Sequence, residues 1–199
     1  MTSSSGDHLE TEQKYDADPD FVLPDLGRAE PRRIYLSATY FDTEGFDLIR
    51  NKITLRRRVG GDDEGWHLKL PVSKDTRQEV RAPLDDTDSV PARLAAQVKD
   101  ITAGQRLRPI ALLDTERTVV TLAGPAGDAL VEVADDRVTA LRFGQTDSEP
   151  MTWREIEVEL KSSDPGAAGL LESVGAALRE AGAKPSASGS KLARVLGTS

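Results

Sequence analysis

Two stretches near opposite ends of the chain carry the same alternation of charged residues, and this alternation constrains the fold most strongly. The first stretch is Glu10-Thr11-Glu12-Gln13-Lys14, and the second is Glu155-Ile156-Glu157-Val158-Glu159-Leu160-Lys161. Residues two apart in a β-strand point to the same face, so each stretch predicts a strand with a row of carboxylates that ends in an ammonium group. The other face of the second strand is apolar and must be buried. A sheet of such strands either shows its ionic face to water or curls that face around something charged.

Short alternating runs continue through most of the chain and predict a strand-dominated, mainly antiparallel domain. The glycine-rich and acidic segment 60–65 resembles a calcium-binding run, but a hairpin turn between two strands is the better interpretation. A helix is expected over 91–101, and another over 166–181 with Asp164 as its N-cap. Shorter helical segments are expected at 44–51 and 190–196. The predicted strands cover residues 9–15, 33–41, 52–59, 66–71, 77–82, 115–122, 129–134, 137–143 and 151–161.

The composition limits the kind of protein. The 199 residues suffice for one domain with a sizeable core, which we expect over residues 8–199 behind a flexible tail, residues 1–7. Without cysteine, disulfides and thiolate metal sites are excluded, and a cytoplasmic location is expected. No apolar stretch approaches the length of a membrane span, so no membrane partner is expected. The net charge of −8 argues against a nucleic-acid surface, but a locally basic cavity can still bind a polyanion.

The two signs of charge are separated along the chain. Carboxylates concentrate in the first and last predicted strands, whereas the middle strands carry cations, such as Arg56 and Arg58 on one face. His67 shares a face with Lys69, although a lone histidine on a strand is more often a bystander than a functional group. For any single strand, an ordinary solvated face is the favoured interpretation, but such a face would mix the signs. The segregation favours a composite ligand, in which carboxylates hold a divalent metal while Arg and Lys hold polyphosphate oxygens.

Taken in order, these motifs resemble the CYTH domain of the triphosphate tunnel metalloenzymes. The resemblance runs from about residue 8 to residue 197, and the ordered set is specific although each motif alone is weak. It is carried by Glu10-x-Glu12-x-Lys14, Tyr40-Phe41-Asp42-Thr43, Thr54-Leu55-Arg56-Arg57-Arg58, Trp66-His67-Leu68-Lys69-Leu70-Pro71, Glu155-x-Glu157-x-Glu159-Leu160 and Ser190-Lys191.

The resemblance implies an α+β, mainly β fold: a closed antiparallel barrel of eight strands around a charged tunnel for triphosphate, with a few helices packed outside. The acids that match the metal-holding positions of the family are Glu10, Glu12, Glu132, Glu155, Glu157 and Glu159. For Glu132 the match is less secure, because Asp135 and Asp136 compete for that role. The cations that match the phosphate-binding positions are Lys14, Arg56, Arg58, Lys69, Arg117 and Lys191.

The function implied by the resemblance is hydrolysis of inorganic triphosphate to pyrophosphate and phosphate with Mg²⁺ or Mn²⁺. Glu155 or Glu159 is expected to position the attacking water, and Lys69 to contribute to catalysis. One alternative is a non-catalytic module that binds polyphosphate or a nucleotide. Another is a thiamine triphosphatase or adenylate cyclase, which the low aromatic content of 5% disfavours. Some bacterial members carry a following helical CHAD domain, so the chain is expected to be either a lone protein or part of a longer parent protein.

Overall fold

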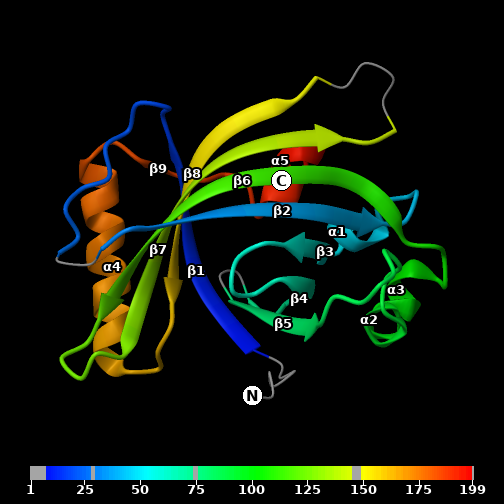
Figure 1. The fold of residues 1–199 in the computed structure, drawn as a ribbon, viewed down its shortest axis with the longest axis horizontal. Helices are drawn as coiled ribbons and strands as arrows, with labels where there is room; N and C mark the ends of the chain where they lie inside the picture. Colours follow the sequence, from blue (N-terminus) through cyan, green and yellow to red (C-terminus); the bar gives the residue numbers. More distant parts are fainter. Residues whose placement is uncertain (1–7, 28–29, 74–75, 145–148, 199) are drawn as a thin grey trace.

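The computed structural model describes residues 8–27, 30–73, 76–144 and 149–198, and the predicted tail, residues 1–7, lies outside this part of the chain. Within it, eight antiparallel strands close into a barrel, which confirms the predicted architecture (Figure 1). A ninth short strand, β9 (Lys184–Pro185), pairs with the edge of β1. The eight barrel strands are β1 (His8–Ala17), β2 (Arg32–Asp42), β3 (Thr54–Val59), β4 (Gly65–Pro71), β5 (Thr76–Ala82), β6 (Arg108–Ala123), β7 (Ala129–Arg142) and β8 (Met151–Leu160).

Strand β1 closes the barrel because it pairs with two different strands along its length. Residues 8–11 pair with β5, and residues 12–17 pair with β8. Going round the wall from β1, the order is β5, β4, β3, β2, β6, β7 and β8. The first and last charged strands of the sequence therefore become direct neighbours, and the cationic strands lie across the barrel from them.

Much of the apolar core lies outside the barrel wall, between the strands and the covering helices. Helix α4 (Pro165–Glu180) packs Leu171, Val174 and Leu178 against Ile156 and Val158 of β8. This helix begins where the sequence predicts, since the Asp164 carboxylate accepts a hydrogen bond from the Gly166 amide at 2.7 Å. The apolar face of the last charged strand is thus buried outside, which leaves its carboxylates pointing into the barrel.

Three shorter helices cover the opposite side of the barrel, as Figure 1 shows. They are α1 (Asp47–Arg50), α2 (Ala92–Gln97) and α3 (Lys99–Thr102). Leu48, Leu94 and Val98 pack there against the outward-facing Leu55 and Leu68 of β3 and β4. Among the described residues, no helix is long and apolar enough to cross a membrane.

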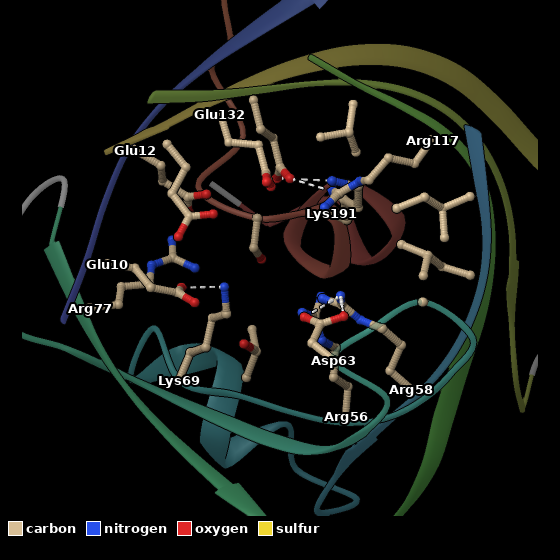
Figure 2. Close-up of a pocket in the computed structure, with 18 of the residues that line it drawn as sticks. Glu10, Glu12, Arg56, Arg58, Asp63, Lys69, Arg77, Arg117, Glu132 and Lys191 are labelled. Atoms are coloured by element: carbon tan, nitrogen blue, oxygen red, sulfur yellow. Dashed lines mark hydrogen bonds and ion pairs between the residues drawn. The ribbon is translucent and has the colours of Figure 1, made fainter. Parts of the chain in front are cut away.

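Helix α5 (Lys191–Leu196) lies across one end of the barrel. Its Leu192 and Val195 pack against Ala38, Leu113 and Val138, which share the inward face of their strands with cavity residues. The helix starts at Ser190, whose hydroxyl accepts a hydrogen bond from the Ala193 amide at 3.1 Å. The far end of the lumen is therefore filled by apolar side chains, and Figure 2 shows α5 behind the cavity.

The main differences from the predicted elements have physical causes. β7 is one strand, although the two aspartates at its centre suggested a break between 129–134 and 137–143. Asp135 points outward to Arg154 in a paired contact of 2.7 and 2.8 Å, and Asp136 points inward to Arg117, so both charges are neutralised within the strand. The predicted 91–101 helix is divided at Val98, whose backbone leaves helical geometry at φ −114° and ψ 9°.

Candidate functional site

A cavity of about 250 Å³ inside the barrel is lined mainly by charged side chains (Figure 2). Ten are basic and seven are acidic, so the lining carries a formal charge of +3 in a chain whose net charge is −8. The basic residues are Lys14, Arg32, Arg56, Arg58, Lys69, Arg77, Arg81, Arg117, Lys161 and Lys191. The acidic residues are Glu10, Glu12, Asp62, Asp63, Glu132, Glu157 and Glu159. Such a cavity attracts polyanions even though the whole protein repels them.

The alternation of the strands explains why these charges face inward. On β3, Arg56 and Arg58 line the cavity, whereas Leu55 points to the other face and is buried outside the barrel. On β4, Lys69 lines the cavity while Leu68 is buried outside. Since the apolar side of each strand must pack under helices, the charged side has no position other than the lumen.

Two guanidinium groups that line the cavity, those of Arg56 and Arg77, have no carboxylate partner among the described residues. Within the described part of the chain, no carboxylate oxygen lies within 4.0 Å of Arg56, and its closest polar contact is the Tyr40 hydroxyl at 3.4 Å. Burial opposes the charge of Arg56, but Tyr40 and Glu79 outweigh it and raise the pKa of the guanidinium further. Arg77 donates to the Gly189 carbonyl oxygen and also has no carboxylate within ion-pair distance among the described residues. Both groups are charged and free to bind an anion.

Lys191 reaches from α5 to a cluster of three buried or half-buried acids. Its Nζ lies 2.8 Å from Asp136 and Glu155 and 2.9 Å from Glu157. Arg117 adds contacts of 2.7 Å to Asp136 and Glu157. Burial opposes the charges of Lys191 and Glu157, but the opposite charges around them outweigh it, so the pKa of Lys191 is raised and that of Glu157 is lowered.

This cluster is a poor fit for a metal ion despite its geometry. Ligand oxygens of Asp136, Glu155 and Glu157 lie within 4.8 Å of one another, as a metal site requires. However, Lys191 and Arg117 already occupy the space among these oxygens and neutralise them. The acids therefore serve to anchor two cations of the cavity.

A second acidic group fits a divalent cation better. Glu12, Glu159 and Glu132 stand side by side on β1, β8 and β7, because Glu159 pairs in register with both of the others. Among the described residues, the ion pairs of these three acids are with ammonium groups at 3.2 Å: Lys14 beside Glu12 and Lys161 beside Glu159. Carboxylate oxygens are hard ligands of the kind that Mg²⁺ and Mn²⁺ prefer.

The electrostatics of Glu159 agree with this assignment. Burial and the nearby Glu10 raise the pKa of Glu159, and Lys161 only partly offsets them. Glu10 itself, the next inward acid on β1, lies 2.5 Å from the Lys69 ammonium. We define the acidic row as Glu10, Glu12, Glu132 and Glu159; it lies opposite Arg56 and Arg58 in Figure 2.

The structure brings together all the predicted site residues in the cavity lining except Glu155, which points inward but is covered by Lys191. The Glu155 side chain is 4% exposed and accepts a hydrogen bond from Trp153 Nε1 at 2.5 Å as well as the contact with Lys191. It does not line the cavity, whereas Glu159 does. Of the two acids predicted to position water, Glu159 therefore has access to a ligand.

Four functional positions were not assigned from the sequence. Arg77 and Arg81 line the cavity from β5, and their alternation with Glu79 was a visible signal. Asp136 anchors Lys191 and Arg117, and Asp63 enters the cavity from the turn between β3 and β4. Only the three-dimensional arrangement distinguishes Asp136 from its neighbour Asp135, and Asp63 from the other acids of its turn.

His67 does not line the cavity but fixes the wall beside it. Its ring is 1% exposed, with Nδ1 2.8 Å from Glu79 Oε1 and Nε2 2.8 Å from the Asp63 carbonyl oxygen. Both ring nitrogens therefore face oxygen atoms that can accept hydrogen bonds. Burial would raise the pKa of Glu79, but His67 and Lys69 outweigh it and hold that pKa well below its ordinary value.

Comparisons with known proteins agree with this geometry. A family model for the CYTH domain matches residues 8–195. Two uncharacterized proteins of Mycobacterium tuberculosis, Rv2226 and MT2285, are each 45% identical over 96% of this chain, which spans only 40% of their length.

Solved structures show the same fold at low sequence identity. The bh2851 protein of Bacillus halodurans, named as a candidate adenylate cyclase, superposes with a TM-score of 0.63 at 17% identity, covering 95% of this chain and 98% of its own. HpAC1 from Hippeastrum, described as having a dominant triphosphatase activity, gives 0.56 at 18% identity, with 96% of each chain covered.

Proposed function

Because the chain belongs to the CYTH family, whose members bind triphosphate substrates, we propose that it hydrolyses a triphosphate with the help of a divalent cation. The family includes both triphosphatases and adenylate cyclases. The observation that carries the proposal is the cavity itself, whose lining has a local charge of +3 and places the acidic row opposite Arg56 and Arg58. Inorganic triphosphate is the substrate that this lining fits best, because most of the lining residues are charged and Tyr40 is the only aromatic one among the described residues.

The cations that line the cavity would hold the phosphate chain. Arg56 and Arg77 lack carboxylate partners among the described residues, and guanidinium groups match phosphate oxygens closely. Arg117 and Lys191 are held in place by the buried acids beneath them, so they need not reorganise when an anion arrives. Lys14, Arg58 and Lys69 complete the set of predicted phosphate-binding residues that line the cavity.

The acidic row, Glu10, Glu12, Glu132 and Glu159, would hold Mg²⁺ or Mn²⁺, as expected in a family that is generally dependent on divalent metals. Glu157 and Glu155 remain predicted ligands, although the contacts of Lys191 occupy both. When bound, such an ion supplies charge neutralisation at the phosphate oxygens and acidifies a water. The chain's own residues provide the rest of the chemistry.

The hydrolytic step needs a base for the attacking water and a stabilised leaving group. Glu159 would accept the proton of the water at a carboxylate oxygen, and its raised pKa suits that role. As the phosphoanhydride bond breaks, the negative charge that grows on the pyrophosphate oxygen would be balanced by Lys69 and the arginines. The products are phosphate and pyrophosphate.

The test is a substrate panel of inorganic triphosphate, ATP, thiamine triphosphate and long-chain polyphosphate, each with Mg²⁺ and with Mn²⁺. We expect phosphate and pyrophosphate from inorganic triphosphate, and loss of this activity after Glu10→Ala combined with Glu12→Ala. Glu116→Ala, an exposed acid on the outer face of β6, serves as the matched control. Tight binding of triphosphate without turnover would contradict hydrolysis and support a binding module. Formation of cyclic AMP from ATP would support a cyclase.

A cytoplasmic location and a following CHAD domain remain predictions. The chain spans 40% of the length of its curated relatives, and what the remainder of those proteins does is a separate question.

A further inference from the structure

Asp63 lies in the middle of the cations that would bind phosphate. It belongs to the turn between β3 and β4, and Figure 2 shows it between Arg56 and Arg58. Arg58 Nη1 lies 2.7 Å from both carboxylate oxygens of Asp63. The negative charge of Asp63 also contributes to raising the pKa values of Arg56, Arg81 and Arg117, after the larger effects of burial and closer partners. One carboxylate thus faces four arginines on three strands.

The backbone of Asp63 is fixed while its side chain remains accessible. The Asp63 carbonyl oxygen accepts a hydrogen bond from the buried His67 ring at 2.8 Å. Gly60 begins the turn with a left-handed φ of 87°, and a Cβ there would lie 2.4 Å from the Tyr35 carbonyl oxygen. By contrast, the Asp63 side chain is 35% exposed. A rotation about its side-chain torsions would take the carboxylate out of the cation cluster without any change in the wall.

We propose that Asp63 is a built-in competitor for phosphate: its carboxylate occupies the Arg58 position in the empty cavity and must leave when a phosphate group binds there. This inference rests on the proposed function for the identity of the ligand. Carboxylate and phosphate oxygens make the same charge-assisted contacts with a guanidinium group, so the two anions exclude each other.

This arrangement affects both selectivity and turnover. The apparent affinity of a ligand equals its intrinsic affinity multiplied by the fraction of molecules in which Asp63 has already left Arg58. An anion of high charge recovers this loss through the other cations of the cavity, whereas a single phosphate or sulfate does not. After hydrolysis, the return of Asp63 to Arg58 would favour release of pyrophosphate.

The experiment measures binding of inorganic triphosphate by calorimetry in EDTA, which makes the result independent of turnover. Asp63→Asn should bind about five- to tenfold more tightly than the wild type, as expected for loss of a partly exposed competing ion pair. Glu64→Gln is the matched control, because it removes an exposed charge from the same turn, outside the cavity lining. Its affinity should stay within about twofold of the wild type. Asp63→Ser, checked for folding by circular dichroism, provides a second variant.

The outcomes separate this inference from the proposed function. Unchanged or weaker binding by both folded Asp63 variants would overturn the competitor role, even if the wild type hydrolyses triphosphate. Tighter binding by both variants without hydrolysis by the wild type would support the competitor role and overturn the hydrolase. Equal tightening by Glu64→Gln would show a general charge effect and would overturn the role of Asp63. Failure of every protein to bind triphosphate in EDTA would overturn the competitor role, whereas the proposed function is decided by the substrate panel with Mg²⁺ and Mn²⁺.

Discussion

Glu159 and Glu155 point inward from the same strand, yet we expect their removal to have opposite effects on stability. Glu159 faces Glu12 and Glu132 across the neighbouring strands, and like charges in such pairs destabilise by about 0.2–1 kcal/mol each. The pair with Lys161 is partly exposed and offsets at most about 1 kcal/mol. In metal-free protein, Glu159→Gln should therefore raise the free energy of unfolding by up to about 1 kcal/mol. For a chain of this length, that corresponds to a rise in Tm of up to about 4 °C.

Divalent metal should instead make the wild type more stable than Glu159→Gln. A ligand at one hundred times its Kd stabilises the folded state by about 2.7 kcal/mol, and the wild type should gain this in Mn²⁺. Glu159→Gln removes a proposed ligand and should lose most of that gain. Glu155→Gln instead breaks a buried contact with Lys191, which should cost about 1–3 kcal/mol with and without metal while the response to Mn²⁺ is kept.

The assay is thermal unfolding followed by circular dichroism in EDTA and in excess Mn²⁺, with Glu116→Gln as a surface control. The reasoning fails if Glu159→Gln melts below the wild type in EDTA, or if it keeps the full response to Mn²⁺. It also fails if Glu155→Gln loses that response, because the buried cluster would then be the metal site.

Two further predictions concern the charged groups outside the acidic row. Arg56→Met should leave Tm within about 2 °C of the wild type but raise the KM for triphosphate at least about tenfold, because this half-buried cation has no carboxylate partner within 4.0 Å in the described chain. In the same two assays, Arg154→Met should lower Tm and leave the KM for triphosphate unchanged. Its paired contact with Asp135 lies outside the lumen, and the loss of that contact costs about 3 kcal/mol or more. Acid should destabilise the fold, because His67 and Lys14 outweigh burial and hold the pKa values of Glu79 and Glu157 below normal. The folded state then binds fewer protons than the unfolded chain, so the free energy of unfolding in urea should fall as pH drops below about 4.5; a flat profile from pH 5 to pH 3 would contradict this.

Much of the site could be predicted because strand alternation is a local property of the sequence. Arg56 and Arg58 stand two apart, and Leu55 is flanked by polar residues, so the inward and outward faces of β3 can be assigned without knowledge of its neighbours. The same holds for Glu157 and Glu159 on β8. The family resemblance then adds closure of the barrel, which alternation alone does not give.

The environment of each charge could not be predicted in this way. Glu155 and Glu159 are equivalent in the sequence pattern. They differ because Lys191 of α5, more than thirty residues away in the sequence, contacts Glu155 and not Glu159. The role of Asp63 likewise depends on the approach of Arg58 and His67 to a turn that reads as ordinary. Such contacts follow from how the ends of the barrel are filled, which no local pattern contains.

The packing of much of the apolar core outside the wall has a further consequence. In most domains, a substitution near the centre leaves a void or forces an overlap, because the centre is where the hydrocarbon side chains meet. Here the cavity at the centre is lined mainly by charged side chains, and Ile156, Val158, Leu55 and Leu68 pack behind the strands. Lining residues can therefore be exchanged in pairs of balanced charge with little effect on the scaffold, which makes this barrel a suitable host for selecting new polyanion specificities.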